Sequence, residues 1–235
     1  MLNEVKLIHK SVCILLTLQT YFKNIKLKNK CKVNNMNDKV RKIIEKAKEN
    51  DGLIRTSNIE KLGISRTYIC DLVKSGFLVH ESWGLYSINE EIPDEYIVIQ
   101  KRSKKLIFSY ATALFLHGLS DRVPRITDIT VPQGYNVNKL KKSYDNLRFH
   151  YIKPELLLEG IESIITPQGF KVTVYNKERC ICEMIRAEKY FDKQIYIQVL
   201  QDYFKNYFNQ RELIRMSKLF KVEKEIRRYM EVLRQ

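Results

Sequence analysis

The chain has 235 residues, a formal net charge of +15 at pH 7, 44% apolar residues and 29% charged residues. This length suits two small domains better than one, and the composition can fill real cores, which excludes a globally disordered chain. No run of about 20 apolar residues occurs, so we expect no membrane span. The five cysteines lack a paired framework spacing, which favours free thiols in a reducing, cytoplasmic setting.

The positive charge is unevenly distributed. Residues 1–36 carry seven lysines and one glutamate, whereas residues 37–92 carry nine basic and nine acidic residues. The remaining excess lies in residues 93–235. The total charge therefore does not indicate that residues 37–92 bind phosphate, because that depends on Lys and Arg sharing one face.

The first 36 residues form a basic leader. An apolar run within it resembles a signal peptide only weakly, because no small-residue cleavage site follows. Two interpretations stay open: a disordered basic arm, or sequence translated from a misplaced start, with Met36 as the native beginning. We favour the second, because residues 38–49 begin a helix cleanly, with Asp38 as its cap and an apolar stripe along one side.

Residues 53–88 carry the most informative pattern, that of a winged helix-turn-helix. Thr56 or Ser57 can cap a short helix over residues 58–62, because a hydroxyl there accepts an orphan amide hydrogen. Gly63 then supplies a left-handed turn that bulkier residues resist.

A second helix follows this turn, capped by Ser65 and ended by Gly76. Its buried stripe has the helical spacing i, i+3, i+4 and consists of Ile69, Leu72 and Val73. Its outward side chains are Arg66, Thr67, Cys70, Asp71 and Lys74, with Tyr68 at the margin. Two strands, residues 77–80 and 85–88, then flank a turn around Trp83 and form the wing.

An outward, polar second helix after a glycine turn is the geometry that places side chains against base edges, so we predict that residues 37–92 are a DNA-binding domain. Arg66 is the candidate for a bidentate contact to guanine, with Lys74 and Trp83 nearer the DNA backbone. The predicted contact residues are Arg55, Ser65, Arg66, Thr67, Tyr68, Asp71, Lys74, Trp83, Lys101, Arg102, Lys104 and Lys105. The alternatives are a winged helix that contacts protein and, for the run 101–105, a solvated basic surface.

A linker around Pro93 opens a second domain over residues 94–235. We expect helices over 94–102, 110–117, 178–186, 193–208, 210–219 and 221–234, and strands over 106–108, 126–131, 148–151 and 170–175. The predicted fold class is therefore α+β: an N-terminal winged helix-turn-helix followed by a mixed α/β domain that ends in a helical bundle.

Polar residues of the helix 178–186 follow a helical spacing. Asn176 can cap this helix. Arg179, Glu183 and Arg186 are spaced i, i+4, i+7, so they share a face as an ion-pair row, opposite a buried face of Ile181, Met184 and Ile185. A structural ion pair is favoured over catalysis for this row. His117, before Gly118, is expected to be a C-terminal helix cap, with a functional role left open.

The sequence has no convergent catalytic constellation. The histidines are scattered, and Cys180 and Cys182 diverge on a helix, which favours packed thiols over a zinc site. A magnesium-dependent nuclease would need a second carboxylate and a lysine beside Asp128, which the strand 170–175 does not supply. We predict no enzyme, no cofactor and no metal. The aromatic residues of the C-terminal part are expected to pack between helices, with RNA stacking as the minor alternative.

Two blocks of the second domain resemble a known family. In SYATALFLHGLSDRVPRITDITVPQGYN, an H-G-L helix end leads through a D-R-x-P loop to a strand that ends in V-P-x-G-Y. The block VYNKERCICEMIR resembles V-Y-D-x-E-R-T-I-C-D-L-I-R, from which Asn176, Cys180 and Glu183 depart conservatively. Together with the preceding winged helix, this order resembles the AbiEi family over roughly residues 38–234. The motif residues are His117, Asp121, Arg122, Glu178, Arg179, Glu183 and Arg186.

The resemblance implies an antitoxin of a type IV toxin–antitoxin system of abortive infection, a form of phage defence. Such a protein is a transcriptional autorepressor that binds double-stranded DNA of its own promoter, where inverted repeats are expected. Its second domain opposes a nucleotidyltransferase-type toxin without needing a stable complex. Two alternatives stay open: an interaction protein that clamps its toxin directly, and a winged-helix regulator outside any toxin–antitoxin system.

The neutral winged domain also suggests a division of labour. We predict that basic residues of the second domain, namely the run 101–105 and Lys139, Lys141 and Lys142, add salt-sensitive DNA contacts that carry no sequence preference. The alternative is that these residues form only a solvated surface.

Overall fold

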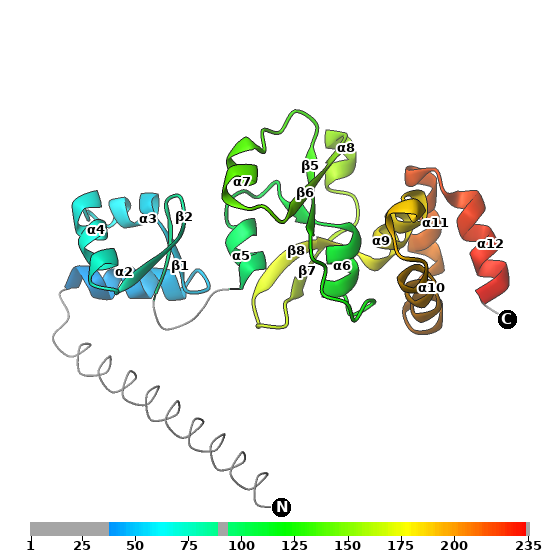
Figure 1. Cartoon of the computed structure of the whole chain (residues 1–235), viewed down its shortest axis with the longest axis horizontal. Coiled ribbons are helices and arrows are strands. Elements are labelled where there is room, and N and C mark those ends of the chain that lie inside the picture. Colours follow the sequence, from blue (N-terminus) through cyan, green and yellow to red (C-terminus); the bar gives the residue numbers. More distant parts are fainter. Residues whose placement is uncertain (1–37, 89–93, 234–235) are drawn as a thin grey trace, which may run out of the picture. The chain divides into compact units, whose positions relative to one another are not determined.

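The computed structural model describes residues 38–88 and 94–233, and the chain divides into two compact units between Glu91 and Ile92 (Figure 1). Both units combine helices with strands and the second ends in helices, so the protein is of the α+β class. None of the described helices is both long and apolar enough to cross a bilayer. The expectations for residues 1–36 lie outside the described residues.

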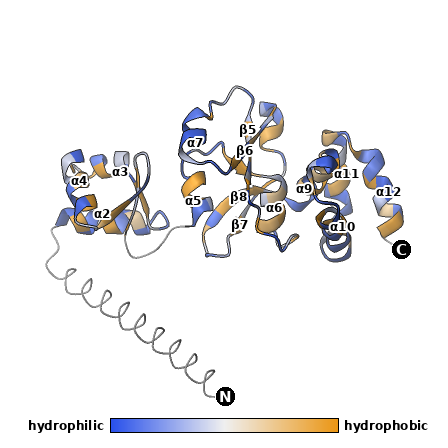
Figure 2. Ribbon diagram, viewed as in Figure 1, coloured by the Kyte–Doolittle hydropathy of each residue, from blue (hydrophilic) through white to orange (hydrophobic). Residues whose placement is uncertain are grey.

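The first unit packs three helices against a small antiparallel sheet with the strand order β1-β3-β2. Its elements are α2 (Asp38–Lys48), β1 (Leu53–Arg55), α3 (Thr56–Lys61), α4 (Arg66–Lys74), β2 (Leu78–Ser82) and β3 (Leu85–Ile88). The helices have one apolar and one hydrophilic side (Figure 2). Their apolar sides meet in a core that includes Val40, Ile43 and Ala47 of α2 and Ile69 and Leu72 of α4.

The start of α3 differs from the prediction. Neither Thr56 nor Ser57 caps it, because the helix already begins at Thr56 and its cap residue, Arg55, makes no side-chain capping bond. Instead, the Thr56 amide donates to the Gly84 carbonyl at 2.9 Å. The first amide of the helix therefore binds the turn between β2 and β3, and no side-chain hydroxyl caps the helix. The short strand β1, which leads into the helix, was not predicted.

The second unit is built on a mixed sheet with the strand order β6-β5-β4-β8-β7. Its strands are β4 (Ile107–Phe108), β5 (Thr127–Pro132), β6 (Leu147–Ile152), β7 (Ile161–Ile165) and β8 (Lys171–Tyr175). The pairs β5–β6 and β4–β8 are parallel, and the pairs β4–β5 and β7–β8 are antiparallel. Strand β5, predicted over 126–131, is buried along its whole length, its threonines included. The buried Thr130 hydroxyl donates a hydrogen bond to the Ser109 hydroxyl at 2.9 Å.

Helices surround this sheet and continue beyond it. They are α5 (Glu95–Gln100), α6 (Tyr110–Leu116), α7 (Asn138–Ser143), α8 (Pro154–Leu157), α9 (Lys177–Arg186), η1 (Glu188–Tyr190), α10 (Lys193–Asp202), η2 (Tyr203–Tyr207), α11 (Gln210–Phe220) and α12 (Glu223–Leu233). Helix α9 packs against α6 on one side and against α11 on the other. It therefore joins the sheet part to the helical end (Figure 1).

Several elements of this unit differ from the prediction. Strand β7 and the short helices α7 and α8 were not predicted, because their sequences are too short or too irregular to show a clear period. The helix expected over 193–208 changes after Asp202 into a π-helical turn. Asn176 caps α9 as predicted, since its side chain accepts a hydrogen bond from the Arg179 amide.

Gly160 lies where the turn before β7 meets the start of α9. Its φ is +66°, and its carbonyl accepts a hydrogen bond from the Asn176 amide at 2.7 Å. A Cβ at this position would lie 2.6 Å from Met216 Cε and 2.9 Å from Asn176 Oδ1. A side chain here would therefore push on the atom that caps α9.

Replacing Gly160 by Ala should destabilise the second unit by roughly 2–3 kcal/mol, from left-handed backbone strain together with a weakened helix cap. Gly134→Ala is the matched control, because Gly134 also has a positive φ, +80°, but no atom within 4 Å of the added Cβ. Urea unfolding of both variants measures the difference. Equal losses in the two variants would contradict the proposed steric contact.

Candidate nucleic-acid interface

Helix α4 presents a polar surface to solvent. The Ser65 hydroxyl accepts a hydrogen bond from the Tyr68 amide at 3.4 Å, which fixes the first turn of the helix. Ile69 and Leu72 are buried beneath the helix, and Val73 is half-buried. The residues expected to face outward are all exposed, with Tyr68 half-buried at the margin: Arg66, Thr67, Cys70, Asp71 and Lys74. Gly63, with φ +74°, makes the turn that precedes the helix.

Arg66 is held by a neighbour across the turn. Its Nε donates to Glu60 Oε1 at 2.5 Å, and this bond raises the pKa of the guanidinium. The pair is exposed to solvent, where water competes with it and salt screens it, so it holds Arg66 only weakly. The guanidinium can therefore exchange Glu60 for another acceptor.

The turn between β2 and β3 carries a large apolar side chain into solvent. Trp83 is 85% exposed, whereas Leu85 after it is buried. Gly84 has φ +69°, and a Cβ there would lie 3.3 Å from Thr56 Oγ1. Arg55, at the start of α3, is exposed in the same unit. Both Arg55 and Trp83 make contacts within the structure.

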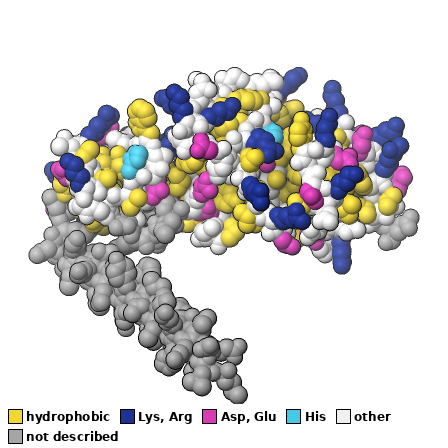
Figure 3. All heavy atoms as spheres, viewed as in Figure 1, with side chains coloured by type: hydrophobic (Ala, Val, Ile, Leu, Met, Phe, Trp, Pro, Cys, Tyr) yellow, Lys and Arg dark blue, Asp and Glu magenta, His cyan; other side chains and the backbone are white. Residues whose placement is uncertain are grey.

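The basic run at 101–105 is only partly exposed. Lys101 and Arg102 are half-buried after α5, whereas Lys104 and Lys105 are exposed. Arg102 Nη1 is buried without a hydrogen-bond partner among the described residues. On the face that Figure 3 shows, Lys and Arg side chains are scattered among acidic and apolar ones rather than gathered in one patch.

His117 is the C-cap residue of α6, as predicted. Its Nε2 lies 2.7 Å from the Tyr175 carbonyl and 3.2 Å from Glu162 Oε1. Burial lowers the pKa of His117 below its ordinary value, although the Tyr175 carbonyl and Glu162 oppose this shift. The neutral ring therefore donates from Nε2 to the carbonyl and ties α6 to the end of β8. Asp121 and Arg122, four and five residues later, are exposed.

Arg179 is fully buried at the centre of the second unit. Its Nε donates to Glu183 Oε1 at 3.0 Å, and its Nη1 donates to the carbonyls of Leu156, at 2.8 Å, and Glu159. The guanidinium carbon lies 3.2 Å from the centre of the Tyr175 ring. Arg179 Nη2 and Glu183 Oε2 are buried without a hydrogen-bond partner in the part of the chain that the structure describes.

The predicted ion-pair row is therefore correct for Arg179 and Glu183 but wrong in its setting. The row was expected on a face opposite the buried one, yet every residue from Glu178 to Ile185 is buried. The reason is that both α6 and α11 pack against α9. Arg186 leaves the row, because it is exposed and its Nη2 donates to the Tyr110 hydroxyl at 3.2 Å.

Burial governs the protonation of this network. It raises the pKa of the Glu183 carboxyl, while the Arg179 guanidinium opposes that shift. It also raises the pKa of Glu178, whose carboxylate accepts a hydrogen bond from the Tyr203 hydroxyl at 3.2 Å. Cys180 and Cys182 are both buried, as the packed-thiol prediction requires, and burial raises the pKa of Cys182 to about 12.

A polar cluster that the sequence did not indicate lies beside this network. Asp128 on β5 accepts from His150 Nε2 at 2.8 Å, and Arg148 Nε lies 3.6 Å away. The His150 ring stacks on Tyr110 with ring centres 3.9 Å apart. Tyr110 starts α6 with an unusual φ of +47°. These residues are far apart in the sequence, so no spacing could reveal them. Among the described residues, no group of three His, Cys, Asp or Glu side chains is placed to hold a metal.

Comparison with known proteins gives a likeness of fold. No family model matches the chain, and no curated protein matches it. The chain is similar to the crystal structure of the RV2827C protein from Mycobacterium tuberculosis, with a TM-score of 0.57 and 14% sequence identity. The match covers 85% of this chain and 82% of that chain. The matched part of this chain is longer than the second unit, so it includes residues of the first unit.

Replacing Arg179 by Met should destabilise the second unit by about 3–5 kcal/mol, because Glu183 would stay buried without its partner. Arg227→Met is the matched control, since Arg227 pairs with Glu223 at the same four-residue separation but on an exposed surface, where loss of a pair costs about 1 kcal/mol or less. Urea unfolding of the two variants tests the contrast. Comparable losses in both would show that burial of the Arg179 pair has no special weight.

Proposed function

We propose that the protein is a DNA-binding autorepressor and an antitoxin of the AbiEi type, whose first unit is a winged helix-turn-helix. The observation that carries the DNA-binding part is the exposed polar surface of α4. This helix follows a left-handed glycine turn, is fixed at its start by Ser65 and precedes a two-stranded wing. A helix so placed can enter the major groove with its N-terminal residues against base edges.

Arg66 and Lys74 would then have different roles. Arg66 is near the start of α4, where its planar guanidinium can bind guanine through two hydrogen bonds. Its exposed partner Glu60 is easily displaced by a base. Lys74 is at the other end of the helix and would contact phosphate, and Trp83 in the wing would also lie near the DNA backbone. Asp71 would have to lie away from the phosphates, because like charges repel.

The antitoxin part rests on the motif blocks of the second unit. Motif residues Glu178, Arg179 and Glu183 are buried and hold α9 in place. They would therefore act by shaping the domain rather than by touching a toxin. Motif residues Asp121, Arg122 and Arg186 are exposed, so these three are the ones available to contact a partner or a ligand.

A direct clamp on the toxin is the second candidate, and one observation favours it. An apolar hollow of about 300 Å³ lies between α10 and α12. Ile197 and Val232 line it and are 54% and 69% exposed. Exposed apolar side chains around a hollow are typical of protein contacts. If the toxin and this protein co-elute as a stable complex at micromolar concentration, the clamp is favoured over action without a complex.

Substitutions on α4 test the DNA-binding part with the promoter of the protein's own gene. Arg66→Ala should weaken operator binding by about 10- to 100-fold and relax the preference at one base pair. Lys74→Ala should weaken binding to all sequences and reduce the salt slope by about 1. Gel shifts and anisotropy at several salt concentrations measure both effects, and Lys48→Ala on α2 is the control. A wild-type protein that gives no sequence-dependent shift at moderate salt would refute the repressor proposal.

Separate expression of the two parts tests the division of labour. Residues 37–92 should keep the sequence preference but bind more weakly than the full chain, because the second unit carries the basic excess. Residues 94–235 should still protect cells that express the neighbouring toxin, as colony counts will measure. Operator binding by residues 37–92 as tight as that of the full chain would exclude an electrostatic contribution from the second unit. Loss of protection by residues 94–235 would exclude an independent antitoxin domain.

A further inference from the structure

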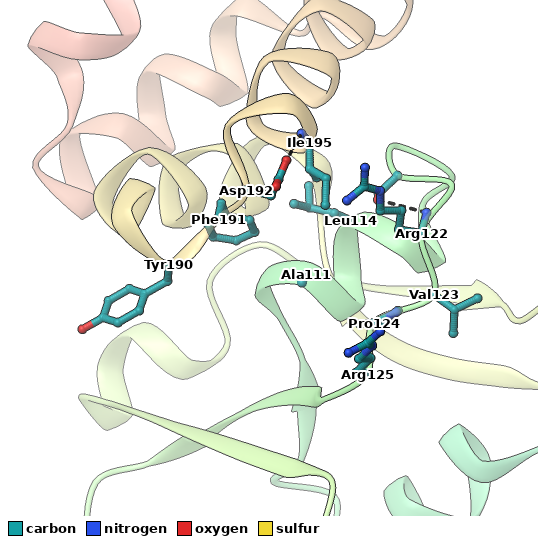
Figure 4. Close-up of a pocket in the computed structure, with 11 residues that line it drawn as sticks. Ala111, Leu114, Arg122, Val123, Pro124, Arg125, Tyr190, Phe191, Asp192 and Ile195 are labelled. Atoms are coloured by element: carbon teal, nitrogen blue, oxygen red, sulfur yellow. Dashed lines mark hydrogen bonds between the residues drawn. The ribbon is translucent and has the colours of Figure 1, made fainter.

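A second hollow, of about 370 Å³, lies in the second unit between the loop after α6 and the start of α10 (Figure 4). Ala111 and Leu114 of α6 lie between its two sides. On one side is the loop with Arg122 and Arg125, and on the other is the segment that starts at Tyr190. Its volume falls at the lower end of the range for small-molecule sites.

The loop side of the hollow is positively charged. Arg122 and Arg125 are both exposed, and neither forms an ion pair with an acid in the described part of the chain. Pro124, which also lines the hollow, lies between them and restricts the backbone of the loop. Two guanidinium groups on a short, stiffened loop are well suited to bind phosphate oxygens, because each can donate two parallel hydrogen bonds.

The opposite side is aromatic and apolar. Phe191 is half-buried, and Tyr190 is 76% exposed. Ile195, from the first turn of α10, also lines the hollow (Figure 4). In Figure 4 the Phe191 ring lies toward Ala111, whereas the Tyr190 ring points away from the hollow. The Phe191 ring therefore offers a face on which a nucleobase can stack, and such stacking is tolerant of base identity.

Asp192 is the acidic residue that lines the hollow. Its Oδ1 accepts hydrogen bonds from the amides of Gln194, at 2.9 Å, and Ile195, at 3.3 Å, which caps α10. The positive end of the helix dipole offsets its charge there. Asp192 therefore leaves the two arginines as the dominant charges of the site.

We propose that this hollow binds a nucleoside triphosphate, with the phosphates on Arg122 and Arg125 and the base on the ring of Phe191. Two guanidinium groups without an ion pair in the described part of the chain lie opposite one aromatic ring (Figure 4), which matches a ligand that has an anionic end and a flat ring. The volume of about 370 Å³ is of the order of one nucleotide. The site is separate from α4, so it extends beyond the proposed DNA binding.

Direct titration of the full chain tests the site. The probes are ATP, GTP, CTP and UTP, with inorganic triphosphate, adenosine and a short 5′-hydroxyl RNA for comparison, all by isothermal titration calorimetry. Tyr190→Trp places a fluorophore at the hollow for an independent signal. The nucleoside triphosphates should bind, and inorganic triphosphate and adenosine should each bind at least about tenfold more weakly, because each meets only one side of the hollow.

Two substitutions and a control decide whether the hollow is the site. Arg122→Ala and Arg125→Ala should each weaken the binding of nucleoside triphosphates by about tenfold or more. Arg228→Ala, an exposed arginine on α12, should leave it unchanged. Phe191→Leu should weaken the binding of nucleotides but not the binding of inorganic triphosphate. Thermal unfolding checks that each variant folds, and operator gel shifts on the same preparations keep this proposal separate from DNA binding.

Three results would overturn the proposal. The first is the absence of nucleotide binding by the wild-type chain. The second is binding that both arginine variants retain. The third is tighter binding of inorganic triphosphate or of the RNA than of any nucleoside triphosphate, because the site would then be a simple anion site or a strand site.

Discussion

The guanidinium of Arg179 is buried where four parts of the second unit meet. It pairs with Glu183 one turn along α9 and donates to the carbonyls of Leu156, in α8, and Glu159, between α8 and β7. It also lies against the rings of Tyr175 on β8 and Phe220 on α11. A charge without water is tolerated only when such partners replace the solvent. The second unit is therefore stable only when α9, the α8–β7 segment, β8 and α11 are all in place around this charge.

The same network explains why the sheet and the helical end form one unit. Asn176 caps α9 and also donates to Glu212 on α11 at 3.4 Å. Arg215 on α11 binds both Glu212 and Glu159, at 2.8 Å and 2.6 Å. The start of α9 is thus linked to α11 from outside by polar contacts and from inside by the buried arginine.

Local patterns predicted much of this structure. The helices α2, α4, α9 and α11, the cap at Asn176 and the outward set on α4 all follow from spacing within one element. Strand β1 has three residues and was not predicted, so its pairing with β3, rather than its own sequence, determines the extended conformation. The π-helical turn after Asp202 likewise has no signal in the residue pattern.

The candidate sites were harder to predict because their members come together only in the folded chain. The spacing of Arg179 and Glu183 indicated an ion pair, but its burial depends on α11, which covers α9 from more than twenty residues away. The stack of Tyr110 on His150 joins a helix start to a strand forty residues later. Nothing in either segment marks that pairing. A single sequence therefore gives the elements and some of their caps, but not which of their polar faces are enclosed.

The two carbonyls that accept hydrogen bonds from Arg179 also indicate which segments of the second unit tolerate an insertion or new chain ends. Leu156 and Glu159 present backbone atoms to the guanidinium, so the path of the chain between them matters more than their side chains. An insertion, a nick or new chain ends there would separate these acceptors from the charge. The hairpin tip between β7 and β8 is different, because Pro167, Gln168 and Gly169 are exposed. That tip is the natural place in the second unit for an epitope tag or a circular permutation.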